Sequence, residues 1–95
     1  MTKAELVTEI SRKTGLEKAA VSTVIEEFMQ TVKDSLAEGN NVYLRGFGSF
    51  ILKTRKAKIA RNISKNTAIM LDEHKAPSFK AAQAFMDEIR DAFKQ

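Results

Sequence analysis

One change in hydrophobic spacing, at residues 39–41, divides this chain into two kinds of structure. Before it, apolar residues from Val21 to Leu36 recur every three or four positions, which predicts an amphipathic helix. After it, from Val42 to Leu52, apolar residues recur at every second position, which predicts strands. A glycine and two asparagines separate the two patterns and supply a helix stop and a turn. The sequence therefore predicts an α+β fold with helices ahead of a sheet.

A further helix signature stands at the N-terminus. Thr2 and Glu5 have the spacing of a capping box, in which two side chains satisfy free backbone N–H groups at a helix start. We expect a helix from about residue 3 to Thr14. Gly15 follows directly and suits the left-handed position that ends many helices.

The C-terminal part contains another apolar run and a last amphipathic pattern. The run, at residues 68–71, can pair back as a third antiparallel strand, which we expect Pro77 to end. Phe85, Ile89 and Phe93 then share one helical face and predict a C-terminal helix. A 95-residue chain buries only about 60–65 % of its unfolded surface, and this one has more apolar surface than one such unit covers. A dimer, with the sheets and second helices facing each other, resolves this excess.

The positive charge of the chain is concentrated in its middle third. The net charge is +4, and residues 41–71 contain seven Lys or Arg and no Asp or Glu. Both flanking parts are weakly acidic. Beyond Leu52 neither alternating face is apolar, so an extended chain there leaves the core and carries its cations outward. An arm that tracks a polyanion fits this pattern, whereas a flexible charged loop or a targeting patch is the simpler alternative.

Enzymatic chemistry has little support in this sequence. There is no cysteine, no phosphate-binding loop and no dinucleotide-binding fingerprint, and His74 is the single histidine. We interpret His74, beside Asp72 and Glu73, as a solvated loop residue. We expect no catalytic residue, no metal and no cofactor. No apolar run is long enough for a membrane span or a secretory signal, so we expect neither.

Four segments together resemble the HU/IHF family of bacterial histone-like DNA-binding proteins. They are GFGSF (residues 46–50), Arg55, ARN (residues 60–62) and PSFKA (residues 77–81), in this order. The resemblance implies an intertwined dimer whose protomers have two N-terminal helices, a three-stranded antiparallel sheet extended into a β-ribbon arm, and a C-terminal helix. It also implies binding to double-stranded DNA through the minor groove, with bending and compaction and little sequence specificity; members of this family are established minor-groove architectural proteins.

The resemblance further implies how the chain is organised and what it meets. We expect one domain over residues 1–95, with a helical dimerisation part at 1–39, the sheet and arm at 41–76, the arm itself at about 53–70, and the C-terminal helix at 78–95. The expected partners are duplex DNA and a second copy of the chain, or a paralogous HU/IHF-like subunit, but no membrane and no small-molecule substrate. The expected location is the nucleoid of the bacterial cytoplasm.

The arm tip departs from the family pattern. Ile63 stands where the family usually has a proline that wedges between base pairs, and Lys65 and Asn66 replace a Thr-Gly pair. Isoleucine is also a known wedge residue, so we expect Ile63 to intercalate; packing of Ile63 on its own ribbon is the alternative. Ala81 and Ala82 replace a Pro-Gly before the last helix, which puts the usual amide geometry there in doubt.

Carried over position by position, the family pattern gives two sets of residues. The expected DNA-binding set is Lys3, Arg45, Gly46, Ser49, Lys53, Arg55, Lys56, Lys58, Arg61, Asn62, Ile63, Ser64, Lys65, Lys75 and Lys80. The expected dimer core is Val32, Leu36, Leu44, Phe47, Phe50 and Phe79.

Three other functions remain open at the level of sequence. A site-specific IHF-like subunit would select one DNA sequence, and a double-stranded RNA or tRNA binder would recognise A-form shape and 2′-hydroxyls. A dimerisation module without nucleic acid would leave the basic segment at residues 53–65 with no polyanion to meet.

Overall fold

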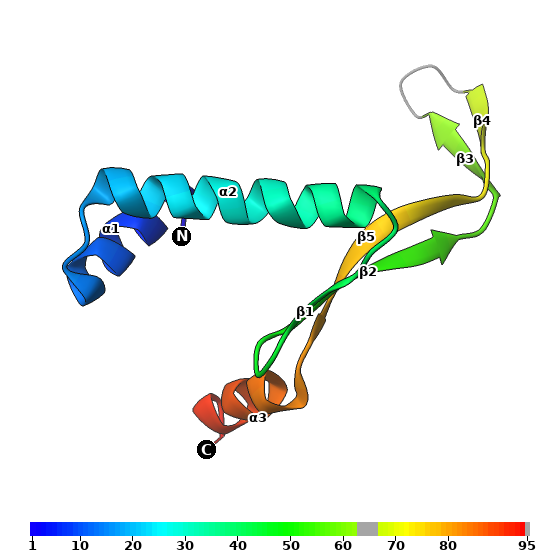
Figure 1. Ribbon diagram of the computed structural model, residues 1–95. Coiled ribbons are helices and arrows are strands. Elements are labelled where there is room, and N and C mark those ends of the chain that lie inside the picture. The colour runs from blue at the N-terminus through cyan, green and yellow to red at the C-terminus, as the bar shows by residue number, and fades with distance from the viewer. Residues whose placement is uncertain (63–66, 95) are drawn as a thin grey trace. The chain divides into compact units, whose positions relative to one another are not determined.

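The computed structural model describes residues 1–62 and 67–94, and it has the predicted α+β composition (Figure 1). Two compact units are present, Met1–Ser35 and Leu36–Gln95. The first unit is helical. The second contains every described strand and the last helix.

Helix α1 (Lys3–Thr14) begins and ends at the predicted signals. The Thr2 hydroxyl accepts a hydrogen bond from the backbone N–H of Glu5 at 3.2 Å. Gly15 closes the helix in the left-handed region at φ 77°, and its N–H donates to the Ser11 carbonyl. On the surface of α1, a hydrogen bond from Arg12 lowers the pKa of Glu9, and Lys13 adds to the effect.

Helix α2 (Lys18–Ala37) is the long amphipathic helix that the spacing predicts. Val21, Val32 and Leu36 on it are buried, as is Val7 on α1. Gly39 follows at φ 90°, and its N–H donates to the Leu36 carbonyl at 2.9 Å. The predicted change from helix to strand therefore falls where the spacing changes.

Three antiparallel strands form the sheet, in the order β1 (Val42–Leu44), β2 (Gly48–Arg55) and β5 (His74–Ala81). The segment between β1 and β2 is a tight turn in which Gly46 has φ 82° and the N–H of Phe47 donates to the Leu44 carbonyl. Glycine suits this position because other residues are strained at positive φ.

A separate two-stranded ribbon is formed by β3 (Lys58–Asn62) and β4 (Thr67–Leu71). Arg55 faces His74 at the end of the first ladder, and Lys58 faces Leu71 at the start of the second. From the first pair to the second, each chain advances by three residues, so the pairing register of the sheet continues unchanged into the ribbon. Two short segments, residues 56–57 and 72–73, lie between the ladders and belong to no strand.

Three expectations for the C-terminal part are wrong in detail. Residues 68–71 belong to the ribbon, and the third strand of the sheet is β5, which continues through Pro77 instead of ending there. Pro77 lies opposite Leu52 on β2. Because β5 is an edge strand, no neighbour on its other side requires the N–H that proline lacks. Helix α3 (Gln83–Ala92) consequently begins later than the expected boundary at residue 78.

One face of the sheet carries a cluster of aromatic rings. The ring of Phe47 lies 5.1 Å from that of Phe79 and is stacked at 5.4 Å on that of Phe85 from α3, while Phe50 and Phe79 are also 5.1 Å apart. Gly48 lies beneath this cluster: a Cβ placed there would be 2.5 Å from Cζ of Phe79. The absence of a side chain at residue 48 is what lets the Phe79 ring lie against β2.

The expected dimer-core residues differ in their burial within one chain. Val32 and Leu36 are buried, and Leu44 and Phe50 are half-buried. Phe47 and Phe79 remain 46 % and 40 % exposed despite their mutual contacts. One protomer therefore leaves much of its aromatic cluster open to solvent.

Candidate nucleic-acid interface

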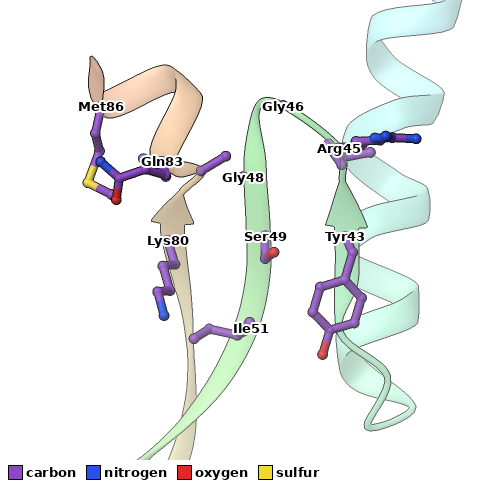
Figure 2. Close-up of a pocket in the computed structure, with 12 residues that line it drawn as sticks. Tyr43, Arg45, Gly46, Gly48, Ser49, Ile51, Lys80, Gln83 and Met86 are labelled. Carbon is purple, nitrogen blue, oxygen red and sulfur yellow. The ribbon is translucent and has the colours of Figure 1, made fainter. Parts of the chain in front are cut away.

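The second face of the sheet is polar and cationic. Strand register puts Tyr43, Ser49 and Lys80 in one row across β1, β2 and β5, and Figure 2 shows their side chains on three neighbouring strands. Alternation along a strand sends every second residue to the same face. The aromatic residues Phe50 and Phe79 occupy the neighbouring register row and so belong to the opposite face.

A hollow of about 680 Å³ lies on this polar face and reaches the start of α3 (Figure 2). It brings together four of the expected DNA-binding residues: Arg45, Gly46, Ser49 and Lys80. Helix α3 contributes Gln83 and Met86 to its wall, and β1 contributes Tyr43, which is 71 % exposed. Sequence reasoning missed Tyr43 as a site residue because it carries no charge, although alternation puts it on the same side as Arg45.

The polar face continues along β2 toward the ribbon. Ile51, Lys53 and Arg55 follow Ser49 at alternate positions; Ile51 is half-buried, and the two cations are exposed. Their cross-strand partners are Ala76 and His74, so no carboxylate stands directly opposite either cation. A row of exposed cations without a facing acid is the arrangement that contacts successive phosphates.

The interpretation of His74 as a loop residue is wrong. It is the first residue of β5, lies directly opposite Arg55, and has its Nδ1 atom 2.9 Å from the carbonyl oxygen of Asp72. No local signal marks His74 as part of a strand, because two acidic residues precede it. Only its pairing with β2 reveals that it shares the face of Lys53 and Arg55.

Three further expected DNA-binding lysines lie apart from Ser49, Lys53 and Lys80. Lys75 lies opposite Thr54, on the face of the aromatic cluster, and its Nζ donates to the Thr54 hydroxyl at 2.6 Å. Lys58 begins the ribbon opposite Leu71, and Lys56 lies between the two ladders. Strand pairing therefore puts Lys75 on the face opposite to that of Ser49, Lys53 and Lys80, whereas Lys56 and Lys58 lie outside the three-stranded sheet.

The remaining expected DNA contacts lie in other parts of the chain. Lys3 belongs to the helical unit and forms an ion pair with Glu26 of α2. Arg61 and Asn62 end β3, paired with Ala68 and Thr67. Outside the described residues lie the three tip positions Ile63, Ser64 and Lys65, including the expected wedge.

Across residues 1–62 and 67–94, no three His, Asp or Glu side chains lie close enough together to hold a metal ion. No helix within those residues has the length and apolar character needed to cross a membrane.

Comparison with known proteins agrees with the resemblance inferred from the four sequence segments. Residues 1–90 match the family model described as bacterial DNA-binding protein. The chain is 35 % identical over 89 residues to DNA-binding protein HU-beta of Escherichia coli, covering 94 % of this chain and 99 % of the relative. It is 34 % identical over 89 residues to integration host factor subunit alpha of Rhizorhabdus wittichii, covering 94 % and 89 %.

A solved structure extends the similarity to three dimensions. The HU chain in an Anabaena HU–DNA cocrystal structure superposes with a TM-score of 0.84 at 30 % sequence identity, covering 94 % of this chain and 97 % of that one. Fold, sequence and family model therefore agree over nearly the whole chain. The chain belongs to the HU/IHF family of bacterial DNA-binding proteins.

Proposed function

We propose that this protein is a nucleoid-associated architectural protein that binds double-stranded DNA as a homodimer, bends it and compacts it. The observation that carries the proposal is the continuous register that joins the cationic sheet face to the β3–β4 ribbon. The Anabaena relative, which shares this fold, was crystallised with DNA.

The charge distribution supports an interface with phosphates. Residues 41–71 hold seven cations and no acid, and Lys53 and Arg55 are exposed on one sheet face with Lys80. Few groups on the arm can read base sequence, because the minor groove that the arm enters presents a degenerate pattern of base edges. Specificity then comes from the shape and deformability of the duplex, so the protein tolerates many sequences and favours pre-bent, nicked or A·T-rich DNA.

The exposed aromatic cluster supports a dimer. Phe47 and Phe79 are 46 % and 40 % exposed in one protomer, which is uncommon for phenylalanine in a monomeric protein. A second copy covers this cluster and creates the intertwined core, with Val32, Leu36, Leu44 and Phe50 contributing. A paralogous HU/IHF-like subunit is the alternative partner, since the similarity extends to an integration host factor subunit.

The ribbon supplies the bending element. Each β3–β4 ribbon, with the tip residues between its strands, enters the minor groove of DNA, and the expected wedge Ile63 unstacks a base step. Bending costs about 1–10 kcal/mol, which phosphate neutralisation and the additional contact surface offset. Residues 1–95 act as one domain in this scheme, in the bacterial nucleoid, with no catalytic step and no cofactor.

A salt titration tests the proposal. With about 7 phosphates neutralised, a plot of log K for a duplex of about 30 base pairs against log salt concentration has a slope near −6. A slope shallower than about −2 would contradict the electrostatic mechanism. The matched competitor is double-stranded RNA of the same sequence: preferential binding to RNA would favour an A-form reader, and strong selection of one DNA sequence would favour an IHF-like subunit.

A further inference from the structure

We propose that Ile59 and Met70 form an apolar contact surface that lies against the sugars of the DNA minor groove and supplies affinity that salt does not weaken. The inference rests on the proposed function, because it needs bound DNA. Both residues belong to the shaft of the ribbon, apart from the tip.

The two residues are a matched pair. Ile59 on β3 lies directly opposite Met70 on β4, one position beyond the pair of Lys58 and Leu71 with which the ribbon begins. Side chains of directly opposite residues stand on the same face of a ribbon. Two large apolar side chains that are far apart in the sequence therefore form one patch.

Pairing across the ribbon leaves both side chains largely exposed. Ile59 is 68 % exposed and Met70 is 65 % exposed, whereas Leu71 on the alternate side is 36 % exposed. Among the described strands, β3 pairs only with β4, so the ribbon is two-stranded. No other described strand covers this apolar face, so the pair adds little stability to the free protein, and its exposure points to a contact made on binding.

Charge identifies the occupant of this patch as DNA. Both residues lie within the acid-free interval of residues 41–71, and Lys58 and Arg61 are the cations nearest to Ile59 in sequence. A second copy of the ribbon would bring like charges together, which is unfavourable, whereas a polyanion is attracted. The walls of the minor groove present sugar C–H groups between two lines of phosphates, so an apolar pair on a ribbon whose first strand is rich in cations matches both its chemistry and its charge.

A salt series on a double variant tests the inference. Ile59→Thr with Met70→Thr removes the apolar area but retains side chains that favour strands. We expect affinity for an A·T-rich duplex of about 30 base pairs to fall about tenfold or more at every salt concentration, with an unchanged slope, because the interaction removed is apolar and not electrostatic. Ile59→Val with Met70→Leu should keep most of the affinity.

Two control variants separate the apolar patch from ribbon stability and from charge. Leu71→Thr alters the same ribbon on the alternate side and should change the affinity less than about twofold. Lys53→Gln should instead make the slope shallower by about one for each phosphate that is no longer neutralised. Circular dichroism and sedimentation are used to check that each variant is folded and has the wild-type oligomeric state before its affinity is compared.

Several outcomes would overturn the inference. Unchanged affinity in the double variant would do so, as would an equal reduction in Leu71→Thr, which would indicate that the pair only holds the ribbon together. A shallower slope in the double variant would mean that the cations had been displaced. Self-association of the wild type that the double variant abolishes, with DNA affinity retained, would assign the patch to a second copy. If the wild type itself failed to bind duplex DNA, the proposed function would fail first.

Discussion

Gly48→Ala is expected to destabilise the fold and to disturb the cationic face at the same time. The added Cβ would stand 2.5 Å from Cζ of Phe79 and 2.6 Å from the carbonyl oxygen of Lys80. Neither separation is tolerable, and the carbonyl belongs to strand backbone that cannot rotate aside. Overpacking of this kind costs about 1–3 kcal/mol in the free energy of unfolding. For a chain of this size, that destabilisation lowers Tm by roughly 5–20 °C.

The consequence for binding follows from the position of the clash. Gly48 precedes Ser49, and the obstructed carbonyl is that of Lys80. To relieve the clash, β2 and β5 must move apart at this point, which displaces both Ser49 and Lys80 on the polar face. Because both residues belong to the expected DNA-binding set, we expect the affinity for duplex DNA to fall. Thermal unfolding and duplex titration are measured at one fixed protomer concentration, because the stability of a dimer depends on concentration.

Two comparisons make the Gly48 prediction decisive. Phe79→Leu removes the ring, so Gly48→Ala should cost less in that background, but some cost should remain because the Lys80 carbonyl is still 2.6 Å away. Gly39→Ala tests glycine replacement in open space: nothing lies within 4 Å of its added Cβ, so its cost comes only from the positive φ. Wild-type stability in Gly48→Ala, or the same cost with and without the Phe79 ring, would refute the packing argument.

Three further predictions concern DNA binding. Lys80→Gln should make the salt slope shallower by about 1.8 for a dimer, whereas Lys75→Gln should change it less, because Lys75 lies on the other face; equal effects in parallel salt titrations would contradict the assignment of faces. Glu26→Gln frees Lys3 from its ion pair and should raise affinity about two- to fivefold at low salt, an increase that must vanish when Lys3 is also replaced by Gln. Ile63→Ala should reduce the DNA bend measured by energy transfer between labelled duplex ends, and an unchanged bend would rule out its role as a wedge.

Signals that act over a few residues were sufficient for much of the fold. Thr2, Gly15 and Gly39 fix helix ends through contacts with their immediate neighbours, and the structure confirms each of them. The switch in hydrophobic spacing located the change from helix to sheet. The acid-free cationic interval and the four family segments indicated the family and the nature of the partner, because charge and motif spacing can be read directly from the order of residues.

Strand pairing could not be predicted in the same way, because it joins residues whose distance along the chain carries no local signal. Pro77 looks like a strand end until β5 is seen to be an edge strand, where its missing N–H costs no ladder bond. His74 looks like a loop residue until it is placed opposite Arg55. Ile59 and Met70 look unrelated until the ribbon register makes them one exposed pair. Residue order was thus enough to predict most of the elements and the charge they carry, whereas register in the folded chain assigns side chains to faces, since a shift of one residue would reverse every face assignment.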